Sequence, residues 1–83
     1  MNSILEIAQK ISIHNRELLR KSEIIGCFNC LKIFNFNEIV EWTDDNEDTA
    51  LCPYCGIDSV LPKTDFYCLD KDFLAVMKQR WFL

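Results

Sequence analysis

Two short motifs, Cys27-Phe28-Asn29-Cys30 and Cys52-Pro53-Tyr54-Cys55-Gly56, decide the fold of this chain. A Cys-x-x-Cys pair lets the backbone turn tightly enough to aim both sulfurs at one point, and two such turns supply four tetrahedral ligands. Residues 31–51 separate the pairs, slightly more than the about 15 to 20 residues usual in zinc ribbons, which a longer hairpin loop absorbs. We therefore predict a zinc ribbon that holds one zinc ion on Cys27, Cys30, Cys52 and Cys55.

Four thiolates fill the tetrahedral shell and leave no position for water or substrate, so the predicted zinc is structural rather than catalytic. No arrangement of nucleophile and base can be recognised elsewhere, and we predict that the chain is not an enzyme. Disulfides are the alternative use of the cysteines. The segment Met1–Glu6 lacks the basic and apolar regions of a signal peptide, so we expect a reducing cytoplasmic location in which thiols remain free.

Length and composition predict a single domain over residues 1–83. The chain is 49% hydrophobic, and at 83 residues an apolar core contributes only about 3 to 5 kcal/mol, so a metal is needed as a staple. No apolar stretch reaches the about 18 residues that span a membrane.

Hydrophobic periodicity predicts a helix on each side of the ribbon. Apolar residues at helical spacing and the capping pair Ser3 and Glu6 indicate a helix over about 4–21, either continuous or broken near His14-Asn15. The ribbon covers about 26–61, with a short helical turn around 36–40 and strand candidates at 31–34, 39–43, 50–51 and 59–61. Asp70 caps a final helix over about 71–82, whose apolar stripe is Phe73, Leu74, Met77 and Trp81. The predicted architecture is α+β, a small zinc ribbon flanked by two amphipathic helices.

Charge argues against a nucleic-acid partner. The net charge is −4, or about −6 with zinc on four thiolates, and Lys32 is the only cation among six carboxylates between Cys30 and Cys52. Such a ribbon would repel phosphates. The basic residues of the predicted first helix, Lys10, Arg16, Arg20 and Lys21, alternate with carboxylates, as on a solvated helix face.

An acidic run at the tip of the predicted hairpin is the candidate surface for a partner. It comprises Asp44, Asp45, Glu47 and Asp48, and it lacks the glycine and the glutamate of a calcium-binding loop. It is either a solvated loop or a surface that binds a basic protein. Trp42 and Trp81 belong to the core or anchor an interface, and exposed aromatic residues would also allow a homodimer.

Two further residues carry chemistry without a recognisable partner. We expect His14 to be a partly buried, hydrogen-bonded residue of the first helix rather than a metal ligand or catalytic base. Cys68 has no partner cysteine, and we expect a half-buried structural thiol rather than a nucleophile.

The chain resembles a family of small bacterial zinc-ribbon proteins described only as cytoplasmic proteins. The resemblance covers about residues 12–82, and its most specific parts are the string Ala50–Val60 and the terminal Trp81-Phe82. It also includes Cys27-Phe28-x-Cys30-Leu31-x-x-Phe34, Glu38-Ile39-x-Glu41-Trp42 and Phe73-Leu74. It implies a bacterial cytosolic protein with zinc on the four cysteines, and it carries over no established activity. The acidic run and Cys68 depart from the family pattern.

These observations predict a non-enzymatic, acidic zinc-ribbon module that binds another protein. In its most concrete form the chain is an inhibitor, antitoxin or immunity-type protein that masks a basic site. The alternative is a nucleic-acid adaptor or regulator that uses the cations of the first helix.

Overall fold

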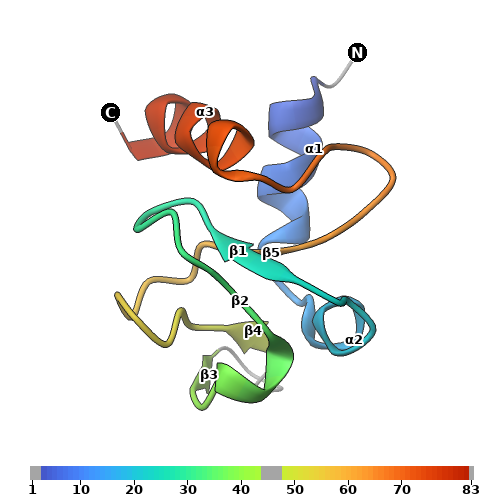
Figure 1. The fold of residues 1–83 in the computed structure, drawn as a ribbon, viewed down its shortest axis with the longest axis vertical. Coiled ribbons are helices and arrows are strands. Elements are labelled where there is room, and N and C mark those ends of the chain that lie inside the picture. Colours follow the sequence, from blue (N-terminus) through green and yellow to red (C-terminus); the bar gives the residue numbers. More distant parts are fainter. Residues whose placement is uncertain (1–2, 44–47, 83) are drawn as a thin grey trace.

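The chain folds into an α+β arrangement of short elements around two small antiparallel sheets, as the sequence predicted (Figure 1). The computed structural model describes residues 3–43 and 48–82. Strands β1 (Ile25–Cys27), β2 (Ile33–Phe34) and β5 (Val60–Pro62) form one sheet in the order β2-β1-β5, and β3 (Trp42–Thr43) pairs with β4 (Thr49–Ala50) in the other. Helices α1 (Ile4–Ile11) and α3 (Lys71–Phe82) lie at the opposite end of the molecule from β3 and β4.

The N-terminal helical region is broken, which was one of the two predicted forms. The Ser3 side chain accepts a hydrogen bond from the Glu6 amide at the start of α1, as the capping pattern indicated. The break at His14, whose φ of 49° lies in the left-handed region, separates α1 from α2 (Arg16–Arg20). Arg16 then donates its amide to the Asp48 carbonyl at 2.9 Å, so α2 starts against the chain that enters β4.

Strand register explains why β1 is the centre of the larger sheet. Gly26 lies opposite Ile33 of β2 on one side and Leu61 of β5 on the other. No strand was predicted at Ile25–Cys27, because a three-residue strand with a central glycine has low β-propensity. An ideal Cβ at Gly26 would lie 2.8 Å from Leu74 Cδ1, so the missing side chain leaves space for a leucine of α3.

Of the other strands, β2 and β3 are shorter than the predicted ranges, and β4 and β5 are shifted by one residue. The candidate at 39–43 contains β3 only at its end, and between β2 and β3 lies the short 3-10 helix η1 (Phe36–Glu38), where the sequence predicted a helical turn. Its capping box uses the backbone and side chains of Asn35 and Glu38. The strand predicted at 50–51 begins one residue earlier, and that at 59–61 one residue later.

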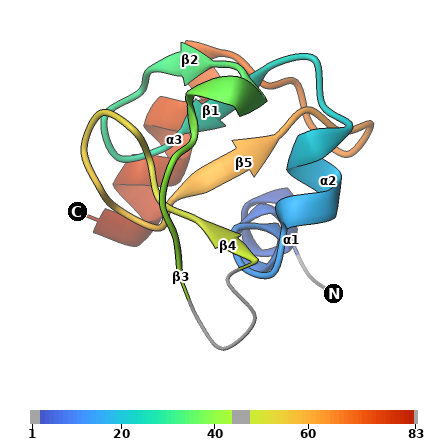
Figure 2. The ribbon, with the colours of Figure 1, turned by 90° about the horizontal axis from the view of Figure 1, so that it is seen from below.

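The buried side chains form two clusters, one on each face of the larger sheet. Neighbouring residues of a strand point to opposite faces, and accordingly Val60 belongs to the first cluster and Leu61 to the second. The first cluster lies on the side of α2 and the smaller sheet and contains Leu19, Ile25, Cys27, Phe34, Ile39, Ala50, Cys52 and Val60. The second lies on the side of α1 and α3 and contains Ala8, Phe28, Leu61, Tyr67, Leu69, Leu74 and Met77. Figure 2 shows α2 and β4 beside β5, with α3 behind the sheet.

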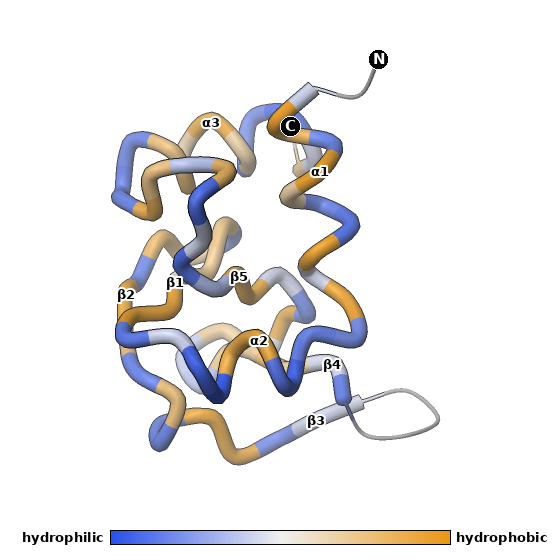
Figure 3. Tube along the Cα trace, turned by 90° about the vertical axis from the view of Figure 1, so that its right-hand side faces the viewer, coloured by the Kyte–Doolittle hydropathy of each residue, from blue (hydrophilic) through white to orange (hydrophobic). Residues whose placement is uncertain are grey.

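Helix α3 packs through the stripe that the sequence indicated. Leu74 and Met77 are fully buried, while Phe73 and Trp81 pack against the second cluster and remain partly exposed. Asp70 accepts a hydrogen bond from the Phe73 amide at 2.8 Å and caps the helix. Along α1 too, hydrophobic and hydrophilic residues alternate, as expected for a helix with one apolar face (Figure 3). None of the described helices is long and apolar enough to cross a membrane.

Candidate metal centre

The first cysteine pair forms a tight turn between β1 and β2. The Asn29 amide donates to Cys27 Sγ at 3.3 Å, and the Leu31 amide donates to the Cys27 carbonyl at 2.9 Å. Leu31 has a φ of 66°, in the left-handed region that reverses the chain after Cys30. The Cys27 amide then donates to the Lys32 carbonyl at 3.0 Å and closes the turn.

The second cysteine pair, after β4, repeats this turn bond for bond. The Tyr54 amide donates to Cys52 Sγ at 3.4 Å, and the Gly56 amide donates to the Cys52 carbonyl at 2.9 Å. Gly56 has a φ of 77° at the position that corresponds to Leu31. The Cys52 amide donates to the Ile57 carbonyl at 3.0 Å. Amide donors stabilise negative charge on a sulfur, so the turns suit thiolates.

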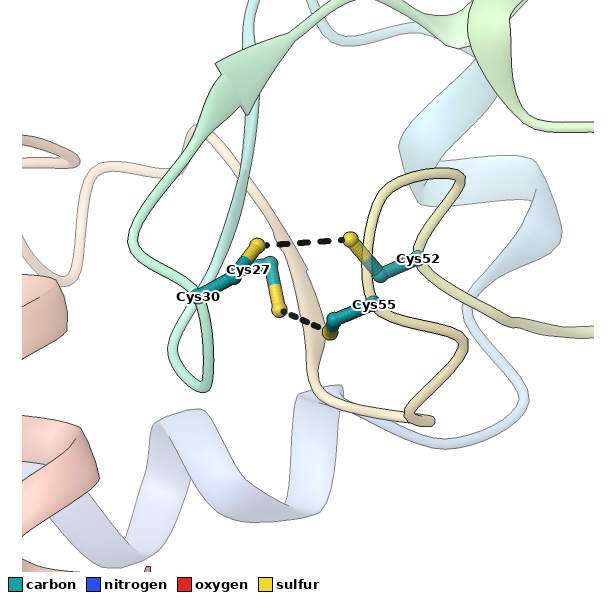
Figure 4. A group of neighbouring side chains, drawn as sticks. All are labelled: Cys27, Cys30, Cys52 and Cys55. Carbon is teal, nitrogen blue, oxygen red and sulfur yellow. Dashed lines mark hydrogen bonds between the residues drawn. The ribbon is translucent and has the colours of Figure 1, made fainter.

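The two turns face each other and bring all four cysteines together (Figure 4). The four sulfurs lie within 4.8 Å of one another. Across the gap, the distance is 3.6 Å from Cys27 Sγ to Cys55 Sγ and 3.6 Å from Cys30 Sγ to Cys52 Sγ. These separations are far beyond the about 2.05 Å of a disulfide bond, and all four thiols are free. The predicted ligands therefore form one cluster that could bind a metal ion.

The dimensions of this cluster fit a small divalent ion. A metal with metal–sulfur bonds of about 2.3 Å has sulfur–sulfur edges of about 3.8 Å when its ligands are tetrahedral. The 3.6 Å separations match such edges. Thiolates favour zinc, copper(I) and iron–sulfur chemistry over magnesium or calcium, so the donor set agrees with zinc.

Burial favours the protonated form of two of the four thiols in the metal-free chain. Burial raises the pKa of Cys27 above its ordinary value despite a hydrogen bond with Ser59, and burial also raises the pKa of Cys52. Burial opposes ionisation of Cys55 too, but hydrogen bonds with the Asn29 side chain and the Ile57 backbone lower its pKa to about 7. At neutral pH a metal must therefore displace protons from the more buried thiols.

A second layer of contacts orients the ligands. Ser59 is buried beside the first ligand, with its Oγ 3.0 Å from Cys27 Sγ. On the outer side, the Tyr54 hydroxyl donates to the Glu38 carboxylate, and the Tyr54 ring packs on Phe34 with ring centroids 5.8 Å apart. These contacts fix the second turn against η1 and β2. Such outer contacts hold metal ligands in their binding orientation.

The sequence did not identify Ser59 or Asn15 as important. Asn15 is buried and donates from Nδ2 to the Val60 carbonyl of β5 at 2.8 Å, and its Oδ1 accepts a longer bond of 3.5 Å from the Ala50 amide of β4. Asn15 thereby joins the two sheets beside the four-cysteine cluster. The only sequence signal was a helix break at this point, and a break does not say where the amide side chain goes.

Of the residues predicted to bind a partner, the structure describes Asp48, Trp42 and Trp81. Asp44, Asp45 and Glu47 lie outside the described residues. Asp48 Oδ1 lies 2.9 Å from His14 Nδ1. Trp42 packs against the first cluster beneath the Arg16 guanidinium, which lies 4.5 Å from the ring centre, and Trp81 packs against the second cluster. Both indoles thus contribute to the packing, on opposite faces of the larger sheet.

Two expectations about single residues were wrong in whole or in part. His14 was expected to be a partly buried, hydrogen-bonded residue of the first helix. Its hydrogen bonding is confirmed by the 2.9 Å contact with Asp48 Oδ1, but it lies in the break between α1 and α2 with 59% of its side chain exposed. Because α1 ends at Ile11, His14 is no longer in the helical register that would place it on the apolar stripe. Cys68 was expected to be half-buried but is exposed, while its neighbours Tyr67 and Leu69 point into the second cluster. The extended chain at this point places alternate side chains outside.

Chemically, the cluster could hold a metal ion with protein ligands alone. Four sulfurs satisfy a tetrahedral ion completely, which is the arrangement of structural sites. Comparison of the chain with family models, with curated proteins and with solved structures finds no match. The chemistry of the cysteine cluster is thus the direct evidence about function.

Proposed function

We propose that this chain is a non-enzymatic module in which one structural zinc ion holds the ribbon and which acts by binding another protein. The observation that carries the first part is the convergence of four sulfurs within 4.8 Å. The residues that would hold zinc are Cys27, Cys30, Cys52 and Cys55. The ion would supply no reaction chemistry, only a rigid link between two turns that are distant in sequence.

Native mass spectrometry and elemental analysis of the purified chain test the metal. We expect one zinc per chain. Cys52→Ser should lose the metal, and the matched control Cys68→Ser should keep it, because Cys68 is an exposed cysteine outside the cluster. Iron in place of zinc, or a metal-free chain that remains folded, would contradict the proposal.

Protein binding is favoured by the charge of the chain. The sequence carries 13 acidic against 9 basic residues, and four of the carboxylates form the run from Asp44 to Asp48. A basic partner site would be attracted to such a surface, with fast and salt-sensitive association. On this basis we propose an inhibitor, antitoxin or immunity-type role, in which the chain masks a basic site, inside a bacterial cell.

Charge reversal separates this role from a solvated loop. The sharpest variant is D44K/D45K/E47K, because it leaves intact the contact of Asp48 with His14. The control E23K/D65K/D72K makes the same charge change at exposed positions elsewhere. Affinity capture from the native cell extract should recover a basic protein with the wild type and the control, but not with the first variant. Equal recovery with all three would remove the acidic run from the proposal.

The nucleic-acid alternative receives less support from the described residues. Two of the four basic residues assigned to it are engaged within the chain, because Arg20 pairs with Glu17 at 2.5 Å and Arg16 lies over Trp42. A filter-binding assay over a salt series tests it directly. Affinity for an oligonucleotide that falls steeply with salt would support the alternative, and binding without this dependence would not.

A further inference from the structure

A small groove lies beside the second cysteine turn, where the chain segments that flank β3 and β4 diverge. Its volume is 130 Å³, and its lining includes Val40, Glu41, Leu51, Pro53, Tyr54 and Gly56. Val40 is 76% exposed, the highest value among the large hydrophobic side chains of the described residues, and Tyr54 is 52% exposed. A partner that covered the groove would remove this apolar surface from water, which favours binding.

The size of the groove limits what enters it. A cavity of about 150 Å³ accommodates a benzene-sized group. The groove therefore suits one apolar side chain and is too small for a cofactor. Binding pockets for single side chains are typical anchors of protein interfaces, where a few buried contacts carry most of the binding energy.

The charge around the groove is negative. Glu41 lies in its lining, and Glu38 is held beside Tyr54 by the hydroxyl that donates to its carboxylate. That bond lowers the pKa of Glu38, so the carboxylate is ionised at neutral pH. Cys52 also lines the groove, and a divalent ion on four thiolates has a net charge of −2. Against these charges stands Lys32, whose Nζ lies 5.2 Å from the Tyr54 ring centre.

We propose that this groove binds a cationic segment of a partner protein, with one apolar side chain in the groove and an arginine or lysine beside it facing Glu41. The inference rests on the proposed function, because it names the surface and the chemistry of the bound protein. The negative balance selects a positive segment, whereas a nucleic acid or a second copy of this acidic chain would bring further negative charge.

Nuclear magnetic resonance with three synthetic peptides tests the assignment. The first peptide consists of three consecutive Gly-Arg-Leu-Arg repeats. The other two have glutamine or glutamate in place of every arginine. Each peptide is added to the zinc-loaded chain labelled with ¹⁵N. We expect amide shifts at Val40, Glu41, Leu51 and Tyr54 with the arginine peptide, weaker shifts with glutamine, and none with glutamate. Shifts confined to other residues, equal shifts with all three peptides, or no shifts with any would overturn the proposal.

A matched pair of variants locates the contact. Val40→Arg should lower the affinity for the arginine peptide about tenfold, as expected for an interface anchor. Val76→Arg should leave it unchanged, because Val76 is an exposed valine on α3, at the other end of the molecule (Figure 1). As a check on folding, both variants must bind one zinc ion, and the amide signals of the residues in the second cluster must keep their wild-type positions. Equal loss in the two variants would show a general charge effect and overturn the assignment.

The other occupants are outcomes of the same measurements. Groove shifts that appear on raising the protein concentration alone would assign the site to a second copy, and groove shifts with a single-stranded oligonucleotide would assign it to nucleic acid. Either result overturns a cationic partner. If D44K/D45K/E47K abolishes capture of a basic protein while Val40→Arg does not, the proposed function stands and the groove assignment fails.

Discussion

The Asn15 side chain links the two sheets through hydrogen bonds at both ends of its amide group. Its amide reaches β5 with one group and β4 with the other, from a position between α1, which ends at Ile11, and α2, which begins at Arg16. A buried amide with both ends bonded specifies one relative placement of the two sheets. The sequence showed only that this region has weak helical character, because hydrogen bonds to residues 35 and 45 positions away leave no local pattern.

Asn15→Ala should lower the free energy of unfolding by about 2 kcal/mol, because the Val60 carbonyl and the Ala50 amide lose their bonds inside the protein. Urea unfolding of the zinc-loaded chain measures the loss. The control is Asn37→Ala, an exposed asparagine of η1, which should change stability by less than about 0.5 kcal/mol. Equal effects in the two variants would contradict a bridging role for Asn15.

Gly56 allows the cost of a left-handed backbone to be tested without a steric clash. Its φ is 77°, and a Cβ built there meets no atom within 4 Å, so a substitution costs conformational energy without a clash. Gly56→Ala should destabilise the zinc-loaded chain by about 1 to 2 kcal/mol. Gly56→Asn should cost less, since asparagine tolerates the left-handed region better. The chelator concentration at half-loss of zinc measures both, and a larger effect of asparagine would argue against this explanation.

At the scale of elements, the packing of α3 on β1 depends on a missing side chain. The terminal methyl groups of Leu74 lie against Gly26, which is why the strand tolerates a glycine at its centre. Periodicity identified α3 and its stripe because twelve consecutive residues of α3 share one face pattern. It could not identify β1, which has three residues, all buried, and so has no alternation to detect.

Gly26→Ala should destabilise the chain by about 1 to 3 kcal/mol, because the added methyl group displaces a fully buried leucine. A double-mutant cycle separates this contact from the general cost of the substitution. Leu74→Ala alone leaves a cavity and should cost about 2 to 5 kcal/mol, but it should cost less in the Gly26→Ala background. Strictly additive free energies of unfolding would show that the two positions do not interact.

The whole molecule is joined through the metal ligands. Cys27 and Cys52 belong to the first cluster, Phe28 next to Cys27 belongs to the second, and β5 contributes to both, so loss of the metal should disturb the two faces together. The cysteine spacing predicted this centre because a metal site needs few residues at fixed intervals. It could not predict the groove or the outer contacts, which arise only when residues 38–41 and 51–56 meet.

Removal of zinc by a chelator should disrupt both hydrophobic clusters, one on each face of the larger sheet. Structural zinc contributes about 10 to 16 kcal/mol of apparent binding energy, which is lost with the ion. The chain contains two tryptophans, one on each cluster, which makes the test direct. In Trp81→Phe the fluorescence reports the first cluster through Trp42, and in Trp42→Phe it reports the second. Both signals should change at the same chelator concentration. A second cluster that persists without zinc would show two independent units.

Zinc affinity should fall as the pH is lowered, because protons compete for the thiolates. Burial raises the pKa of Cys27, so this thiol is protonated in the metal-free chain at neutral pH and binding must release its proton. At least one released proton gives a fall of about tenfold or more per pH unit. Competition with a coloured chelator between about pH 8 and pH 6 measures the slope. An affinity independent of pH would contradict thiolate ligation.

The position of β1 has a consequence for synthesis. Its partner on one side, β2, follows within a few residues, but its partner on the other side, β5, lies beyond the second cysteine turn. Until that last strand of the chain has been synthesised and has paired with β1, the enclosure of Cys27, which includes Ser59 at the start of the same segment, is incomplete. The order of the strands thus makes the protection of the first thiol depend on the last strand to be synthesised.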